Sequence, residues 1–129
     1  MKVMVDTNVI MSALFFPASV PAKALFLAAR NYELILCDHI MEEIFDSVSR
    51  KRPDLLADAD VLLAQLSYET ITAPREPSKL ISDPKDAPIL NAAIIANVDI
   101  IISGDKHFRD LDLEFPKVLT PKQFLVLHG

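Results

Sequence analysis

Short apolar runs alternate with longer segments of helical periodicity along most of the chain. A short run of β-prone residues that ends at polar residues is typical of a strand buried in a parallel sheet. Residues 3–5, 34–36 and 100–102 fit this pattern, and the isoleucines of the last run give the strongest strand signal. Residues 68–72 are predicted to form an edge strand, and residues 118–119 a last short strand.

Helices are predicted between these strands, where apolar residues recur every three or four positions. Asp38 is a predicted N-cap, and apolar residues then repeat at helical spacing up to Val48. The basic residues 50–52 lie at the carboxyl end of this helix, and Pro53 stops it. The Pro-rich polar residues 73–79 are predicted to form a surface loop. The predicted helices span residues 9–16, 21–29, 39–52, 55–66, 83–96 and 121–127.

Strands that alternate with helices indicate an α/β fold whose parallel sheet carries helices on both faces. The length of 129 residues fits a single domain, residues 1–129, and 51% of the residues are hydrophobic, which is enough for a core. Ligands of such sheets bind outside the carboxyl ends of the strands. Asp6 and Asp105 each follow a predicted strand, so both are expected at that edge.

Several classes of protein are excluded by what the sequence lacks. The single cysteine, Cys37, can form neither an internal disulfide nor a paired-cysteine zinc site, and it fits the expected cytoplasmic location. With two glycines there is no glycine-rich phosphate loop, and the three histidines form no H-x-x-x-H zinc motif. No apolar run approaches the about 18 residues of a membrane span. Asp6 interrupts the apolar start too early for a signal peptide.

The net charge of −5 argues against a protein that binds nucleic acid through a broad basic surface. Phosphate binding of that kind normally needs clustered Lys and Arg. The charge leaves open the binding of phosphate through a metal ion. The basic residues 50–52 are predicted to form a solvated helix end, with contacts to RNA phosphates as the alternative.

Four acidic residues stand at positions from which a metal site could be built. Two follow strands and two lie on helices that are expected to pack beside them: Asp6, Asp105, Glu43 and Asp86. Clustered carboxylates repel one another unless a cation lies among them, and a hard ion such as Mg²⁺ or Mn²⁺ prefers oxygen ligands. Such a site can activate water and neutralise a phosphodiester, as a nuclease requires.

Each of these acidic residues also has a purely structural interpretation. Asp6 and Asp105 could be turn residues at the ends of their strands. Asp83 and Asp86 could be helix caps that interact with the helix dipole. Glu43 could be an ordinary surface glutamate. The joint placement of the residues is therefore more specific than any one of them.

The other polar candidates are assigned structural roles from their positions. Ser103 could be a strand-end hydroxyl bonded to the backbone, and Cys37 is expected to be a small buried or capping residue. His39 is predicted to lie on the surface at a helix start, and His107 to flank the site without being a ligand or a base. The tyrosines and phenylalanines are expected in the core.

Four segments, in order, carry a resemblance that covers essentially the whole chain. They are MVDTNVIMSALF, LILCDHIMEEIFDSVSRKRP, ISDPKDAPILNAAIIANVDIIISGDKHF and VLTPKQFL. The most specific pieces are V-D-T-N-V and S-G-D-K-H-F. The chain resembles the PIN-domain ribonucleases, and it is most similar to the bacterial branch of VapC-type toxins from toxin–antitoxin systems.

The resemblance implies a role for individual residues. The family's acidic positions fall on Asp6, Glu43 rather than Glu42, Asp86 and Asp105; its polar helpers fall on Asn8 and Ser103; and Asp83 lies near the site without ligating. Cys37 departs from the family, which has a serine-like N-cap at this position, and this affects helix capping alone. The resemblance also implies a three-layer α/β/α PIN-like fold with a central parallel sheet.

The implied activity is Mg²⁺- or Mn²⁺-dependent endonucleolytic cleavage of RNA that leaves a 5′-phosphate and a 3′-hydroxyl. Because no histidine is placed as a base, the metal is expected to supply the hydroxide. An antitoxin protein and a second copy of the chain are the implied partners. The alternatives are a housekeeping RNA-processing PIN nuclease and a non-catalytic nucleic-acid-binding PIN module. A phosphatase is disfavoured, since D-T-N lacks the second aspartate of a D-x-D pair.

Overall fold

The structure, a computed structural model, describes residues 1–74, 87–111 and 113–129. Over this part of the chain the backbone forms five strands and seven α-helices. The strands are β1 (Lys2–Val5), β2 (Glu33–Cys37), β3 (Tyr68–Ile71), β4 (Ile100–Ile102) and β5 (Lys117–Leu119). The helices are α1 (Thr7–Phe15), α2 (Val20–Asn31), α3 (Asp38–Lys51), α4 (Leu56–Gln65), α5 (Ala87–Ile95), α6 (Lys106–Arg109) and α7 (Pro121–His128), with a 3-10 turn, η1 (Pro53–Leu55), before α4.

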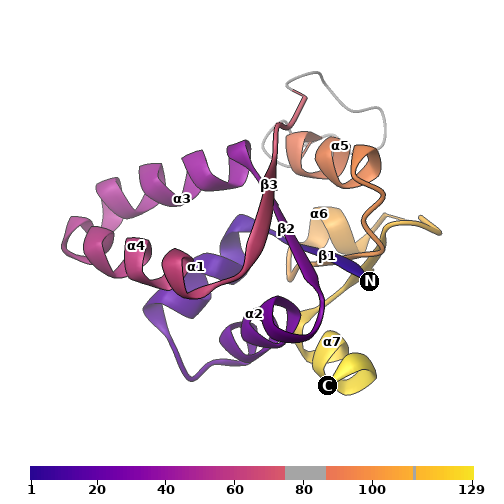
Figure 1. The fold of residues 1–129 in the computed structure, drawn as a ribbon, viewed down its shortest axis with the longest axis horizontal. Helices are drawn as coiled ribbons and strands as arrows, with labels where there is room; N and C mark the ends of the chain where they lie inside the picture. Colours follow the sequence, from indigo (N-terminus) through magenta and orange to yellow (C-terminus); the bar gives the residue numbers. More distant parts are fainter. Residues whose placement is uncertain (75–86, 112) are drawn as a thin grey trace.

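The five strands form one parallel sheet in the order β3-β2-β1-β4-β5 (Figure 1). The central strand β1 pairs with β4 from Val3 opposite Ile100 to Val5 opposite Ile102. The residues that follow these two strands therefore emerge side by side at the carboxyl edge of the sheet. The predicted parallel sheet, with β3 at its edge, is confirmed.

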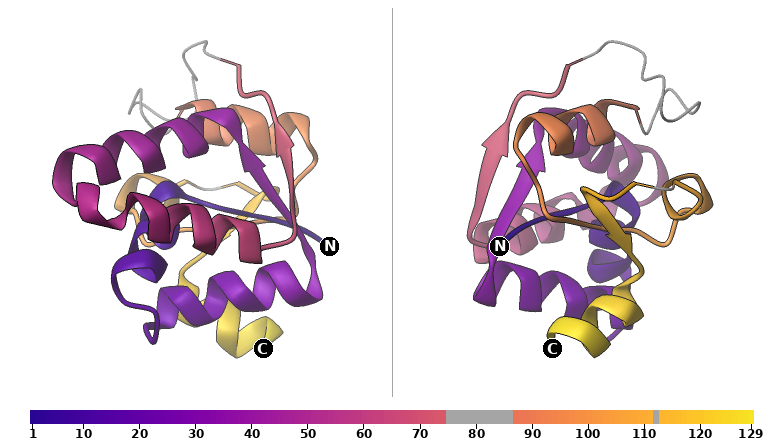
Figure 2. Two further views of the ribbon diagram at one scale, coloured as in Figure 1. Left: turned by 60° about the vertical axis from the view of Figure 1, so that its left-hand side comes forward. Right: turned by 90° about the vertical axis from the view of Figure 1, so that its right-hand side faces the viewer.

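Helices cover both faces of the sheet, which confirms the three-layer α/β/α arrangement (Figure 2). α3 and α5 lie over one face, and α2 and α7 lie over the other (Figures 1 and 2). α2 packs against both α1 and α7, and α3 packs against α1, α4 and α5. Because the inner strands are covered from both sides, they are continuous apolar runs rather than alternating ones.

The hydrophobic core is centred on β1, β2 and β4. All three isoleucines of β4 are buried, and the apolar residues of β1 and β2 are buried as well. No single helix of the described part of the chain is long and apolar enough to cross a membrane; α1 and α2 reach that length only together, bent by 113°. Both of these helices contribute buried residues to the core.

Side-chain oxygens define the starts of several helices. Ser19 caps α2 by accepting a hydrogen bond from the Ala22 N–H, and Thr120 and Gln123 form a reciprocal capping box at α7. Beyond the end of α5, Asn97 has φ 55°, a left-handed conformation that asparagine tolerates. This turn returns the chain to the start of β4.

The start of α3 corrects the sequence prediction. Asp38 is the first residue of the helix, and the buried Cys37 occupies the N-cap position without a side-chain capping hydrogen bond. Asp38 Oδ1 instead accepts hydrogen bonds from the backbone N–H groups of His39 and Ala73, both at 2.8 Å. The carboxylate thus ties the start of α3 to the segment that follows β3.

Further differences concern an additional helix and the aromatic residues. The short helix α6 was not predicted, because a single turn shows no hydrophobic periodicity. Phe16 and Phe115 are exposed, which corrects the expectation that every phenylalanine lies in the core. Tyr32 packs edge-on against the buried Phe124, as expected of core aromatics.

Parts of two predicted elements lie outside the described residues. They are residues 75–79 of the predicted surface loop and residues 83–86 at the start of the predicted helix that corresponds to α5. Pro88 occupies the second position of α5, where a proline is compatible with the first turn.

The position of β4 inside the core generates a stability prediction. Ile101 is fully buried, so Ile101→Ala should lower the free energy of unfolding by about 2–5 kcal/mol. Ile95, at the end of α5, is 64% exposed, and the same substitution there should change stability by less than about 0.5 kcal/mol. Urea titrations of both variants measure the difference. Equal effects of the two substitutions would contradict the central placement of β4.

Candidate functional site

Asp6 lies at the end of β1 and begins α1. Its backbone N–H donates to the Ile102 carbonyl at 3.1 Å, which extends the β1–β4 pairing by one residue. Its Oδ1 accepts a hydrogen bond from the Val9 N–H at 2.9 Å and so caps α1. Its Oδ2 accepts a hydrogen bond from the Ser103 hydroxyl. The residue is only 3% exposed, and it is therefore both a structural cap and a buried carboxylate.

Ser103 connects Asp6 to Asp105. It follows β4 and is fully buried, and its Oγ accepts a hydrogen bond from the Asp105 N–H at 2.9 Å. Asp105 in turn caps α6, since its Oδ1 accepts from the His107 N–H at 2.8 Å. The structural interpretation of Ser103 as a bonded strand-end hydroxyl therefore holds, and its bonds bring the two aspartates to the same edge.

Glu43 reaches this edge from α3. Its Oε1 accepts a hydrogen bond from the Thr7 hydroxyl at 2.8 Å, and Thr7 directly follows Asp6. Glu42 is exposed to solvent, whereas Glu43 is partly buried. The packing of α3 against α1 thus brings Glu43 rather than Glu42 to the aspartates.

Two histidines lie beside these carboxylates. Nε2 of His39 is 3.2 Å from Oε1 of Glu43, and the His39 side chain is only 16% exposed, which corrects the prediction of a surface residue. The i,i+4 spacing of His39 and Glu43 on one helix was the sequence signal that could have revealed this contact. Nδ1 of His107 is 3.5 Å from Oδ1 of Asp105, in the expected flanking position.

The electrostatic environment of Asp6 is unfavourable to its charge. Burial raises the pKa of the Asp6 carboxyl above its ordinary value of 3.8. Hydrogen bonds from Ser103 and Val9 oppose this rise, whereas the nearby charges of Asp105 and Glu43 add to it. The fold therefore keeps the Asp6 carboxyl near the charges of Asp105 and Glu43, and a cation beside Asp6 would relieve this repulsion.

The donor atoms fit a hard divalent cation, because they are carboxylate and hydroxyl oxygens. Within residues 1–74, 87–111 and 113–129, no three acidic, His or Cys side chains are arranged closely enough to hold a metal by themselves. Asp86, the fourth predicted ligand, and Asp83 lie outside the described residues. Asp6, Glu43 and Asp105 are thus the predicted ligands that the structure describes.

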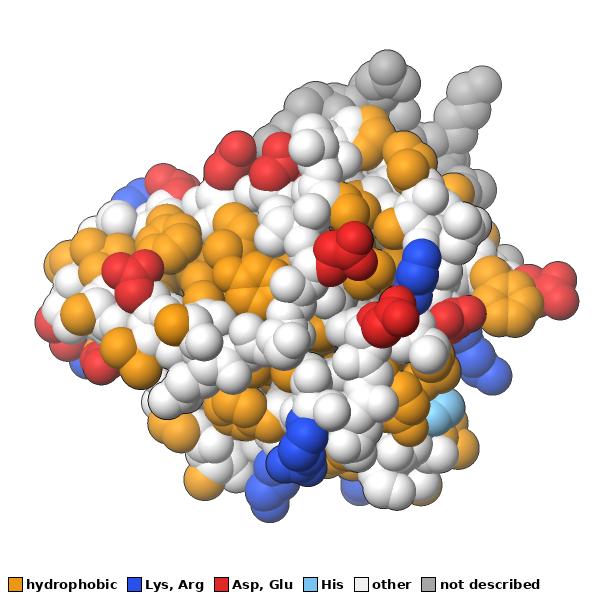
Figure 3. Space-filling view, viewed as in Figure 1, with side chains coloured by type: hydrophobic (Ala, Val, Ile, Leu, Met, Phe, Trp, Pro, Cys, Tyr) orange, Lys and Arg blue, Asp and Glu red, His pale blue; other side chains and the backbone are white. Residues whose placement is uncertain are grey.

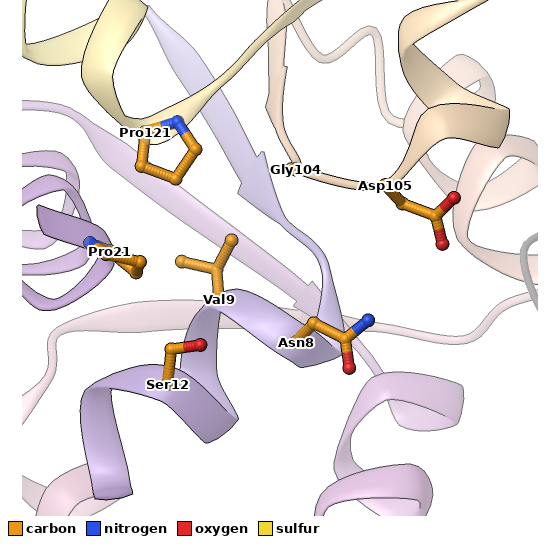
Figure 4. Close-up of a pocket in the computed structure, with 7 residues that line it drawn as sticks. All are labelled: Asn8, Val9, Ser12, Pro21, Gly104, Asp105 and Pro121. Carbon is orange, nitrogen blue, oxygen red and sulfur yellow. The ribbon is translucent and has the colours of Figure 1, made fainter. Parts of the chain in front are cut away.

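A hollow of about 360 Å³ opens next to Asp105 (Figure 4). It is lined by Asn8, Val9, Ser12, Pro21, Gly104, Asp105 and Pro121. The predicted helper Asn8 is exposed, and its amide and the Asp105 carboxylate lie toward one end of the hollow (Figure 4). Val9 and the two prolines lie toward the other end, so the hollow has a polar end and an apolar end.

Basic residues do not form a broad patch on the face seen in Figure 3, where they are scattered among acidic and apolar side chains. In the predicted basic cluster at residues 50–52, Arg50 pairs with Asp46 at 2.9 Å and Arg52 pairs with Asp54 at 2.8 Å. These four side chains are mostly exposed, which agrees with a solvated helix end.

The raised pKa of Asp6 generates a prediction about stability and pH. Between pH 3.8 and the higher pKa of the folded state, the folded chain binds more protons than the unfolded chain, so stability falls as the pH rises through that window. An asparagine in place of Asp6 would keep the helix cap without the charge. The substitution Asp6→Asn should therefore raise the free energy of unfolding at pH 7 by about 0.5–2 kcal/mol.

Urea titrations in EDTA at pH 7 and pH 3 measure this effect. The gain should disappear at pH 3, where the parent carboxyl is protonated in both states. Asp60→Asn, at an exposed position of α4, is the matched control and should change stability by less than about 0.5 kcal/mol at either pH. An Asp6→Asn protein less stable than its parent at pH 7 would show that the charge of Asp6 favours the fold.

Comparison with known proteins places the chain in a family. Residues 2–107 match the PIN domain family. The chain is 32% identical over 142 residues to the uncharacterized protein MJ1680 of Methanocaldococcus jannaschii, a match that covers 96% of this chain and 89% of that protein.

A solved structure shares the fold. It is the crystal structure of VapBC2 from Rickettsia felis bound to a DNA fragment from their promoter, in which one chain matches with a TM-score of 0.71 at 19% identity. The match covers 93% of this chain and 98% of that chain, and at this identity the likeness concerns the fold alone. Because the family match extends over most of the sequence, the chain belongs to the PIN domain family.

Proposed function

We propose that this PIN domain is a Mg²⁺- or Mn²⁺-dependent endoribonuclease and the toxin of a toxin–antitoxin pair. The observation that carries the proposal is the buried Asp6, which Glu43 and Asp105 repel at one edge of the sheet. Asparagine could cap α1 as aspartate does, so the charge of Asp6 raises the energy of the folded chain beyond what the cap requires, whereas a carboxylate provides an oxygen ligand for a divalent cation. Membership of the PIN domain family supports the nuclease class.

The proposed metal ligands are Asp6, Asp86 and Asp105, with Glu43 as a further ligand or as the residue that orients the attacking water. A divalent cation bound there would supply Lewis acidity, which lowers the pKa of water and offsets the charge of a phosphodiester. The oxygen donors of the described residues are compatible with such an ion.

The remaining residues of the site position these carboxylates. The Ser103 hydroxyl holds one oxygen of Asp6, and the Val9 N–H holds the other. The Thr7 hydroxyl and the His39 ring hold Glu43 at 2.8 and 3.2 Å. The amide of Asn8 carries both a donor and an acceptor beside Asp105, and we assign it to the sugar or phosphate oxygens of the substrate.

The toxin assignment, the RNA substrate, the homodimer and action in the cytoplasm rest on the resemblance to VapC-type toxins and on the fold shared with VapBC2. A housekeeping RNA-processing nuclease would have the same site but no antitoxin partner. Expression of the chain alone should arrest growth, and co-expression of a small antitoxin encoded beside it should restore growth. Normal growth on expression of the active enzyme would favour the housekeeping function.

Metal dependence is the first activity test. Purified protein should cleave single-stranded RNA, its activity should disappear in EDTA, and excess Mn²⁺ or Mg²⁺ should restore it. The physical reason is that the carboxylates without a cation repel the negatively charged phosphodiester. End sequencing of the products should show 5′-phosphates and 3′-hydroxyls. Cleavage that persists in excess chelator would rule out the metal mechanism.

The second test uses adjacent glutamates of α3 as a matched pair. Glu43→Gln should lower the cleavage rate by about 10²–10⁴-fold, because Glu43 lies at the site, whereas the exposed Glu42→Gln should leave it unchanged. Asp6→Asn and Asp105→Asn should each lower the rate by orders of magnitude. An inactive Glu42→Gln beside an active Glu43→Gln would contradict the assignment of the helix face. A parent inactive under all conditions would favour a non-catalytic binding module.

A further inference from the structure

Gly104 has no structural reason to be a glycine. It lies between Ser103 and Asp105, and it is one of two glycines in the chain. Its φ is not in the left-handed region, and a Cβ at this position would meet no atom of the described residues within 4 Å. A side chain at such a position normally stabilises a fold, because it restricts the unfolded chain. The fold would thus accept a larger residue here.

Gly104 lines the hollow next to Asp105 and contributes no side chain to it (Figure 4). A larger residue at this position has open space around its Cβ, and we expect its side chain to narrow the hollow. At about 360 Å³ the hollow is at the small end of the range of ligand pockets, about 300–1,000 Å³. This size suits one small group rather than an extended segment of chain.

The lining of the hollow indicates what kind of group fits. The described residues that line it include no Lys or Arg, and Asp105 carries the one charge among them, so this lining is unsuited to a phosphate. Val9, Pro21 and Pro121 give it an apolar end, which suits the flat apolar face of a base. Ser12 and Asn8 add hydroxyl and amide groups that can bond the polar edge of a base or a ribose hydroxyl.

We propose that this hollow binds the nucleoside adjacent to the scissile phosphate, with the base between Val9 and the two prolines and the ribose toward Asn8 and Asp105. The inference rests on the proposed nuclease function, since it assigns the hollow to the same substrate. Sequence-specific RNA recognition usually targets unstacked single-stranded bases, and a pocket with an apolar end beside the site can receive one. The hollow would then determine which base lies next to the cleaved bond.

The test measures binding without requiring cleavage. ¹⁵N-labelled protein in EDTA is titrated with adenosine, guanosine, cytidine and uridine, and with ribose as the ligand that lacks a base. At least one nucleoside should produce saturable shifts of the Val9 and Ser12 amides and of the Asn8 side-chain amide, and ribose should leave the Val9 and Ser12 amides unshifted. Gly104→Val should raise the dissociation constant of that nucleoside at least tenfold.

Ser67→Val is the matched control, because Ser67 lines a separate hollow with Phe26 and Tyr32. It should bind the nucleosides as the parent does, and unchanged spectra elsewhere should show that both variants are folded. The proposal is overturned if no nucleoside shifts these amides, if ribose shifts them equally, or if Gly104→Val binds like the parent. It is also overturned if nucleosides have no effect while Gly104→Val weakens binding of an antitoxin, which would assign the hollow to a protein side chain.

Cleavage assays separate this inference from the proposed function. With RNA oligonucleotides, Gly104→Val should raise KM about tenfold and alter the preferred cleavage position, with kcat changed less. Nucleoside binding by a protein that cleaves no RNA would refute the nuclease function and support the site. Cleavage by a protein that binds no nucleoside would support the function and refute the site.

Discussion

The hydrogen bond from the buried Ser103 hydroxyl to Asp6 joins the ends of β1 and β4, and the arrangement of the site depends on it. Ser103 also accepts from the Asp105 N–H, while the other oxygen of Asp6 caps α1. These hydrogen bonds thus lie at the ends of the neighbouring strands β1 and β4 and at the starts of α1 and α6. Because buried polar groups need partners, the connections cannot shift independently of one another. The carboxylates are consequently held in place by the sheet itself.

The burial of Asp6 near two other carboxylates has an energetic cost. A buried carboxyl with two others nearby is less stable as an anion than it would be in water, and its raised pKa expresses that difference. Because the hydrogen bonds already hold the carboxylates in position, these side chains would need little rearrangement to bind a cation. Such strain at a site is expected where function rather than stability determines the residues. The hollow that Asp105 lines has an apolar end, and in our proposal this end receives the uncharged base of a nucleotide.

The sequence was sufficient to predict the sheet, because its inner strands are apolar runs and the polar residues after them mark their carboxyl ends. It also predicted that Asp6 and Asp105 each follow a strand at that edge, whereas the pairing of their strands, β1 and β4, is a finding of the structure. One detail that it missed depends on a contact between distant residues, because the bond from the Ala73 N–H to Asp38 cannot be seen in local sequence. The contact of His39 with Glu43 is local, and the i,i+4 spacing of the two residues was the signal for it.

The central claim is that the carboxylates around Asp6 form a binding site for a divalent cation. Calorimetric titration of Mn²⁺ into the metal-free protein at pH 7, with Asp6→Asn and Asp105→Asn beside the parent, tests it without reference to any substrate. The account predicts saturable binding by the parent at millimolar metal or below, and strongly weakened binding by both variants. Absence of binding by the parent, or equal binding by all three proteins, would contradict it.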